Sequence, residues 1–182
     1  MRRAQGLNYI TGAVLEGIEP VLKEFKPDWV VVQGDTTTTF AAALAAFYLK
    51  IKVAHVEAGL RTGNIYSPWP EEMNRKLTSQ LATLHFPPTE TSRANLRAEG
   101  VPDARIVVTG NTVIDALVWT RDKIFADKAL QASIAKGYPF LDPKRRMILV
   151  TGHRSENFDG GLERVFEALA ALARRRDVQV VF

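Results

Sequence analysis

The chain has 182 residues, of which 46% are hydrophobic, so it is long enough to fold as one domain or two small ones around a packed core. No run is long and apolar enough to span a bilayer, and the Met-Arg-Arg start is not followed by the apolar segment of a secretory signal. We therefore expect a cytoplasmic protein without membrane contact. The absence of cysteine excludes disulfides, thiolate metal ligands and a cysteine nucleophile.

The formal net charge is +4, but lysine and arginine are dispersed and alternate with acids. Basic clusters occur at 144–146 and 174–176, and each flanks a predicted element. Charges in such places are typical of solvated ends and helix C-termini. We therefore expect no nucleic-acid partner, while a partner that carries phosphates stays open.

The first part of the chain predicts a βαβ unit preceded by a helix. Apolar residues at helical spacing indicate an amphipathic helix over 12–25, interrupted by Pro20. Continuous apolar runs at 29–33 and 52–56 indicate strands, and the Ala-rich segment between them, through Leu49, indicates a helix.

The alternation continues further along the chain. Helices are predicted over 71–80, over 92–99 and from 112 through 119, with strands at 84–86 and 106–108. This order of elements is typical of a doubly wound parallel sheet in an α/β protein.

The pattern weakens between 126 and 146, where Gly137-Tyr138-Pro139 and Asp142-Pro143 break the periodicity, so this segment is predicted to be a connection. A second set of elements then follows. It comprises a strand at 147–150, a helix over 162–172 and a strand at 178–182.

Strand-to-helix loops of a parallel sheet all emerge at its carboxyl edge, so Asp35, Glu57, Gly110 and the loop after 147–150 should face the same way. Asp35 lies in Gly-Asp-Thr-Thr-Thr at a helix start, where it is either a site residue or a helix N-cap. Glu57 directly follows a strand, at the place where such sheets contact ligands.

Glu71 and Glu72 follow Pro-Trp-Pro at the start of a predicted helix. They could be ligand-directed, or they could complement the helix dipole and pair with Arg75 and Lys76 at i,i+4 spacing.

The three histidines give different signals. His55 and His85 lie in strands and are interpreted as hydrogen-bonded core or edge residues. His153 follows a strand, and together with Arg154 it could grip a diphosphate.

The sequence contains no clear motif for binding a cofactor or a metal ion. No Walker loop is present and no Gly-x-Gly-x-x-Gly follows a strand, so no dinucleotide cofactor is expected. Several carboxylates and one histidine could bind a divalent metal, but no tight ligand spacing such as His-Glu-x-x-His occurs. We therefore assign no metal site.

Taken together, the loop motifs closely resemble those of the non-hydrolysing bacterial UDP-N-acetylglucosamine 2-epimerases. They are Gln-Gly-Asp-Thr-Thr-Thr at 33–38, His-Val-Glu-Ala-Gly-Leu-Arg-Thr at 55–62, Pro-Glu-Glu-Met-Asn-Arg at 70–75, Thr-Gly-Asn-Thr-Val-Ile-Asp at 109–115 and Gly-His-Arg-x-Glu-Asn at 152–157. The resemblance implies a glycosyltransferase-B-type fold of two Rossmann-like domains with the UDP-sugar between them. It also implies that residues 1–113 form most of the N-terminal domain, that residues 114–146 connect the two domains, and that residues 147–182 form the start of the UDP-binding domain.

The reaction that the resemblance implies interconverts UDP-N-acetylglucosamine and UDP-N-acetylmannosamine by elimination and re-addition of UDP, for bacterial surface polysaccharide precursors. It implies catalytic roles for Asp35, Glu57, Glu71 and His153, without saying which carboxylate is the base. Substrate binding is assigned to the remaining candidate site residues, which are Arg61, Arg154, Glu156 and Asn157. The full-length protein is expected to be a homodimer that needs no cofactor.

The resemblance covers only the middle half of the family's usual length, so the fold in this chain is expected to be incomplete and the chain alone to have little or no activity. Three alternatives stay open. They are a hydrolysing epimerase or glycosyltransferase of the same architecture, a non-catalytic sugar-nucleotide-binding fragment, and a metal-dependent phosphatase.

Overall fold

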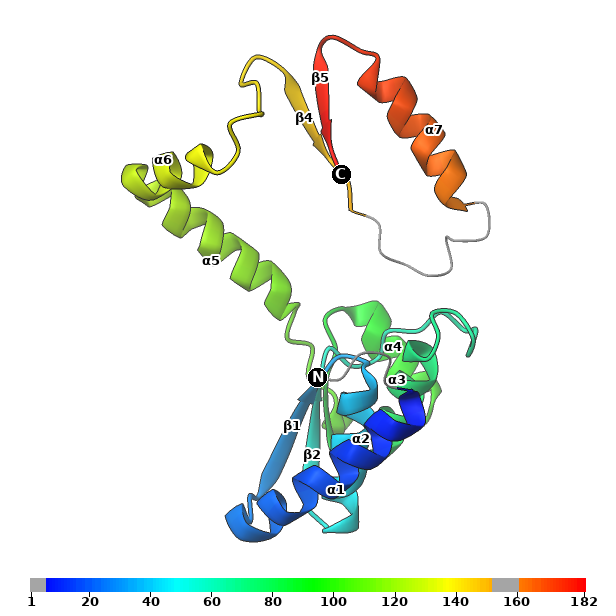
Figure 1. Cartoon of the computed structure of the whole chain (residues 1–182). Helices are drawn as coiled ribbons and strands as arrows, with labels where there is room; N and C mark the ends of the chain where they lie inside the picture. Colours follow the sequence, from blue (N-terminus) through cyan, green and yellow to red (C-terminus); the bar gives the residue numbers. More distant parts are fainter. Residues whose placement is uncertain (1–5, 152–160) are drawn as a thin grey trace. The chain divides into compact units, whose positions relative to one another are not determined.

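The computed structural model describes residues 6–151 and 161–182, and the chain divides into two compact units, Met1–Val113 and Ile114–Phe182. Figure 1 shows the elements of both units in sequence colours. We call them unit 1 and unit 2 and describe each by itself. No helix in 6–151 or 161–182 has the length and apolar character needed to cross a membrane.

Unit 1 contains a parallel sheet in the order β1-β2-β3, formed by β1 (Trp29–Gln33), β2 (Lys52–Val56) and β3 (Leu84–Phe86). Its register places Gln33 beside Val56 and His55 beside His85. The predicted α/β class with parallel strands is therefore confirmed. All strands end at one edge, and the loops of the candidate site leave from that edge.

Four helices accompany this sheet (Figure 1): α1 (Leu7–Phe25), α2 (Thr37–Tyr48), α3 (Glu71–Leu81) and α4 (Glu90–Ala98). Helix α2 packs on β1, β2, α1 and α3. Its alanines are buried together with side chains from the strands and from α1. Small side chains let these backbones approach closely, so α2 is held firmly and its N-terminus is fixed at the carboxyl edge.

Helix α4 packs on the loop after β2 at one closely approached glycine. Gly59 has a φ of 83°, and a Cβ on it would lie 2.3 Å from the Ser92 carbonyl oxygen. Asn95 Nδ2 donates a hydrogen bond of 2.9 Å to the Gly59 carbonyl. Only glycine fits here, and the contact fixes the loop that carries Glu57.

The strand predicted at 106–108 is wrong. Residues Asp103–Arg105 form a 3-10 turn, and Ile106 makes an isolated parallel bridge to His85. Pairing does not extend beyond this bridge because β3 ends at Phe86, and the following Pro87 and Pro88 have no N–H to continue a parallel ladder.

Unit 2 contains most of α5 (Thr112–Ala126), then α6 (Lys128–Lys136), β4 (Arg146–Leu149), α7 (Gly161–Ala173) and β5 (Val178–Val181). Strands β4 and β5 pair in parallel, as expected for a second Rossmann-like set of elements. Helix α6 lies in the segment predicted to be a connection, and Asp127 caps it by accepting from the N–H groups of Ala129 and Leu130. The two breakers lie after this helix, and they obscured it in the sequence.

Candidate functional site

The turn between β1 and α2 brings Asp35 to the carboxyl edge of the sheet. Gly34 adopts a φ of 75°, and its N–H donates to the Val56 carbonyl at 3.0 Å. Thr36, not Asp35, is the N-cap of α2, because its side chain accepts from the Thr39 N–H at 3.2 Å. The capping interpretation of Asp35 is therefore wrong, and its carboxylate serves another contact.

That contact is with Arg75, one turn into α3. Nε and Nη2 of Arg75 both donate to Oδ2 of Asp35, at 2.9 and 2.7 Å. Asn74 Nδ2 donates to the Asp35 backbone carbonyl at 2.9 Å. Helix α3 therefore holds both the main chain and the carboxylate of Asp35.

Glu57 follows β2 directly and has a φ of 64°, which is the left-handed region. Such a conformation costs a non-glycine residue roughly 1–2 kcal/mol, and strained residues of this kind often occur at functional sites. Its N–H donates to the Phe86 carbonyl at 3.0 Å. Its Oε2 lies 3.9 Å from the place of a Cβ on Gly34, so this carboxylate lies next to the turn that carries Asp35.

The adjacent acids at the start of α3 have different surroundings. Glu72 is fully buried and accepts the N–H groups of Thr62 and Gly63, both at 3.2 Å. It also accepts a hydrogen bond of 3.0 Å from Nη1 of Arg75. In contrast, Oε2 of Glu71 is buried without a hydrogen-bond partner among the described residues.

The i,i+4 ion pairs, which were one of the two interpretations of these acids, do not form. Arg75 pairs with Glu72 at i,i+3 and with Asp35, while Lys76 lies 3.6 Å from Glu99. The longer-range partners prevail because Asp35 and Glu99 lie within reach of α3 in the folded unit.

A cavity of about 280 Å3 joins Asp35 and Glu71. It is open to solvent and is lined by acids, hydroxyls and an amide at the N-terminus of α2. Its lining comprises Leu7, Ile10, Asp35, Thr36, Thr37, Thr38, Pro70, Glu71 and Asn74. Carboxylates beside hydroxyls can exchange protons with a polar ligand and donate to its oxygens.

Arg61 was predicted to bind substrate, but its guanidinium nitrogens donate hydrogen bonds to acceptors of the protein itself. It forks onto Glu99 at 2.8 and 2.6 Å and donates to Ser79 Oγ at 3.0 Å and to the Leu60 carbonyl at 2.8 Å. Its hydrogen bonds lower the pKa of Glu99. With 8% of its side chain exposed, Arg61 has the surroundings of a residue that holds its loop to α3 and α4.

The histidines His55 and His85 are buried, as the sequence indicated, but Nδ1 of each ring has no hydrogen-bond partner among the described residues, so the predicted hydrogen bonding is met only in part. Nε2 of His55 lies 2.8 Å from the Gly34 carbonyl oxygen, and burial lowers the pKa of His55. Burial, followed by the charge on His55, lowers the pKa of His85 to about 4. Both rings are neutral at pH 7, so His55 supports the Gly34 turn as a hydrogen-bonding group rather than a cation.

The other predicted site residues, His153, Arg154, Glu156 and Asn157, lie outside the described residues. Within the described part of the chain, no group of three or more histidine or acidic side chains could hold a metal ion.

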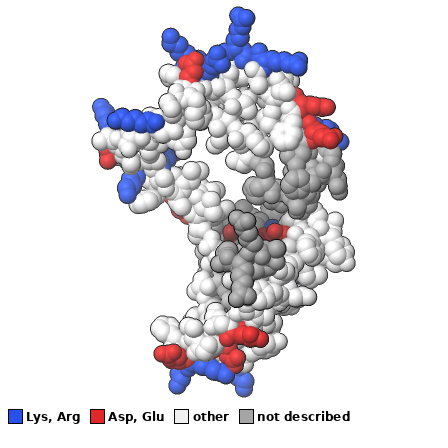
Figure 2. All heavy atoms as spheres, in the orientation of Figure 1, with Lys and Arg blue, Asp and Glu red and all other residues white. Residues whose placement is uncertain are grey.

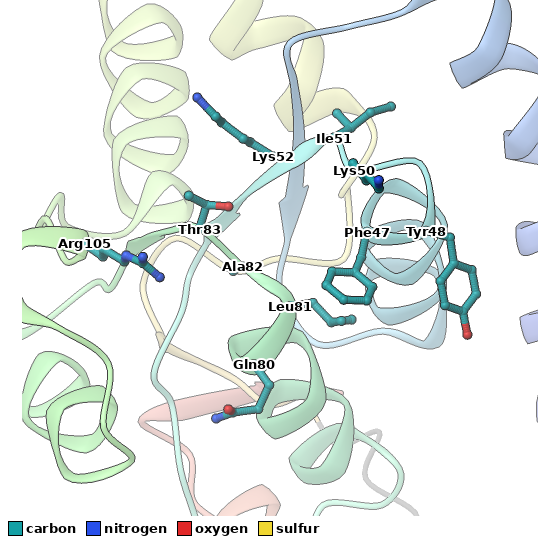
Figure 3. A pocket seen from close by; sticks show the side chains of 10 residues that line it. All are labelled: Phe47, Tyr48, Lys50, Ile51, Lys52, Gln80, Leu81, Ala82, Thr83 and Arg105. Atoms are coloured by element: carbon teal, nitrogen blue, oxygen red, sulfur yellow. The ribbon is translucent and has the colours of Figure 1, made fainter.

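A larger cavity of about 560 Å3 lies at the opposite, amino ends of the strands (Figure 3). Its lining includes Lys52 at the start of β2, Thr83 before β3, and Arg105. No carboxylate is among its lining residues, so it lacks the acid–base groups of the carboxyl edge.

Figure 2 shows acidic and basic side chains close together at the lower end of unit 1, which agrees with the dispersed charge of the sequence.

The fold and the site define a class of protein: a Rossmann-like α/β protein with acidic side chains from successive loops at the carboxyl edge of a parallel sheet. The family model for UDP-N-acetylglucosamine 2-epimerase matches residues 2–182. The chain therefore belongs to the UDP-N-acetylglucosamine 2-epimerase family.

Relatives and solved structures agree with this assignment. The chain is 61% identical to a UDP-N-acetylglucosamine 2-epimerase of Yersinia pestis and 58% identical to that of Escherichia coli K12, each match covering all of this chain and 49% of the relative. A Neisseria meningitidis UDP-GlcNAc 2-epimerase structure bound to UDP-GlcNAc matches 99% of this chain and 48% of its own, with 46% identity and a TM-score of 0.94. The predicted fold class and family resemblance are confirmed, and the chain spans about half the length of the relatives it matches.

Proposed function

We propose that the chain provides acid–base groups for reversible epimerisation at C2 of UDP-N-acetylglucosamine, giving UDP-N-acetylmannosamine for bacterial surface polysaccharides. The Neisseria relative was crystallised with UDP-GlcNAc, and a Methanocaldococcus jannaschii relative, 37% identical with a TM-score of 0.83, with UDP-GlcNAc and UDP. These ligands suit a site that combines carboxylates with hydroxyl donors.

The proposed reaction has two balanced halves. A carboxylate removes the C2 proton while the C1–oxygen bond to UDP breaks, which leaves 2-acetamidoglucal and UDP. UDP then adds back at C1 while an acid protonates C2 from the opposite face. The C2 proton is only weakly acidic until positive charge develops at C1, so the acid–base groups must be held in place before the bond breaks.

The observation that carries the proposal is the meeting of Asp35, Glu57 and Glu71 at one sheet edge, from separate loops. Asp35 and Glu71 line the same cavity, and the Glu57 carboxylate lies over Gly34. We assign proton transfer to this group of carboxylates. His153 is proposed to act at the departing UDP, with Arg154, Glu156 and Asn157 binding substrate. The contacts of Arg61 support a structural contribution to the same site.

The test is a chimera in which this chain replaces the matching segment of the Yersinia pestis relative, so that the relative supplies the other half of the length. We expect it to convert UDP-N-acetylglucosamine to an equilibrium mixture with the C2 epimer and, in D2O, to place deuterium at C2. Asp35→Asn should lower kcat by at least about 100-fold, because general acid–base groups contribute roughly 10²–10⁴-fold.

Asp28→Asn is the matched control, because exposed Asp28 precedes the same strand that Asp35 follows. It should leave kcat unchanged. A folded chimera that does not form the epimer, or that retains full activity with Asp35→Asn, would contradict the proposal. Release of free N-acetylmannosamine and UDP would instead identify a hydrolysing enzyme, and an acceptor requirement would identify a transferase.

The 182-residue polypeptide by itself is proposed to have little activity, since it spans about half the length of its relatives. UDP binding without turnover by the isolated chain is the expected result. Turnover by the isolated chain at a rate near that of the chimera would refute this part.

A further inference from the structure

A partly buried chain of charges links Asp35 to the start of α3 and to the loop after Glu57. It runs from Asp35 through Arg75 to Glu72, with nitrogen–oxygen distances of 2.7 and 3.0 Å. The Arg75 side chain is 11% exposed and Glu72 is fully buried. We call this group the Asp35–Arg75–Glu72 chain.

Each end of the Asp35–Arg75–Glu72 chain is attached to a different segment. Glu72 accepts the backbone N–H groups of Thr62 and Gly63, which lie in the loop after Glu57. Asp35 belongs to the loop after β1, and Arg75 to α3. Removing Arg75 would leave the buried Glu72 carboxylate without its cation and would free the Asp35 carboxylate, while the hydrogen bonds of Glu72 to Thr62 and Gly63 do not involve Arg75.

Arg75 leaves one oxygen of Asp35 for other contacts. Its Nε and Nη2 both donate to Oδ2, and Oδ1 accepts no hydrogen bond among the described residues. Asp35 also lines the cavity that contains Glu71. The two donors together hold Oδ2 in place, which a single flexible ammonium would not do equally well.

We propose that Arg75, itself held by Glu72, is a positioning residue that orients the Asp35 carboxylate for proton transfer at the sugar. This inference rests on the proposed epimerisation and adds a role for a residue outside the predicted site. Arg75 acts through Asp35 and need not touch substrate. Its effect should therefore appear in kcat more than in KM.

The test uses the same chimera. Arg75→Gln should lower kcat about 100-fold and Arg75→Lys about tenfold, with KM within about threefold of its original value, because small misplacements of a catalytic group are costly. Arg93→Gln is the matched control, since Arg93 donates hydrogen bonds of similar length to Asp103, to both of its carboxylate oxygens, on the exposed side of α4. It should change neither constant.

The decisive readout is the double variant. If Arg75 acts through Asp35, Arg75→Gln should change the residual kcat of the Asp35→Asn protein by less than about threefold, because the two changes affect one function. A loss of the same size in both backgrounds would show a general structural role and overturn the inference.

Arg75→Lys keeps the test valid if Arg75→Gln does not fold, because a folded lysine variant with unchanged kcat would also overturn it. The two proposals can be told apart. An inactive unsubstituted chimera would contradict the proposed epimerisation itself. An active chimera whose kcat does not change when Arg75 is replaced would contradict only the positioning role of Arg75.

Discussion

Acid should weaken unit 1 through His85, and replacing His85 by glutamine should remove much of that effect. His85 is 1% exposed and pairs in register with fully buried His55 on the neighbouring strand. Burial, followed by the charge on His55, lowers the pKa of His85 from 6.5 to about 4. Between pH 6.5 and about pH 4, His85 is therefore protonated in the unfolded chain but neutral in the folded unit.

The sign and size follow from this difference. Stability from the neutral ring is fully present above pH 6.5 and is lost as the pH falls toward 4. The full difference corresponds to about 3 kcal/mol, of which about 2 kcal/mol should be lost at about pH 5. His55 acts in the same direction, since burial lowers its pKa as well.

The assay is urea unfolding of the chain, followed by far-UV circular dichroism at about pH 7.5 and about pH 5. The constant cost of His85→Gln cancels in the difference between the two pH values. That difference should be smaller in the variant by about 2 kcal/mol. A control between about pH 7.5 and 9 should show no effect of the substitution on the pH dependence. Equal acid sensitivity with and without His85 would refute the reasoning.

Two further predictions concern stability near the site. Gly59→Ala should destabilise unit 1 by at least about 3 kcal/mol, because its Cβ would lie 2.3 Å from the Ser92 carbonyl oxygen. A Cβ on Gly100 would meet nothing within 4 Å, so Gly100→Ala should cost only about 1–2 kcal/mol, which is the cost of its positive φ. Similar urea midpoints for the two variants would contradict this. Thr36→Ala should cost about 1 kcal/mol through loss of the cap on the Thr39 N–H, and an unchanged thermal midpoint would contradict that contribution.

The sequence predicted most of the regular structure because hydrophobic periodicity depends on local spacing. Strands β1, β2 and β3 and helices α2 and α3 lie close to their predicted bounds. The failures have tertiary or local causes. The parallel ladder stopped at Pro87 and Pro88, and α6 depended on a cap at Asp127 in front of a short helix, which the nearby breakers obscured.

The location of the candidate acids at one sheet edge could be predicted because each follows a strand or a rigid turn. The contact of Arg75 with Asp35 could not be predicted, since the sequence position of Arg75 indicates only a helical ion pair. The available signal was an arginine one turn after Glu71 on a helix that starts at that edge. Its actual partner, Asp35, is 40 residues away in sequence, so the pairing emerges only when α3 packs on α2 beside β1.

Glu71 and Glu72 show why the final assignment required the structure. Neighbouring residues on a helix point in directions about 100° apart, so only one of them can face a given surface. The hydrogen bonds of Glu72 to Thr62, Gly63 and Arg75 fix the rotation of α3 about its axis. That rotation places Glu71 in the cavity with Asp35. A fully buried acid thereby determines which of the two carboxylates lines the cavity.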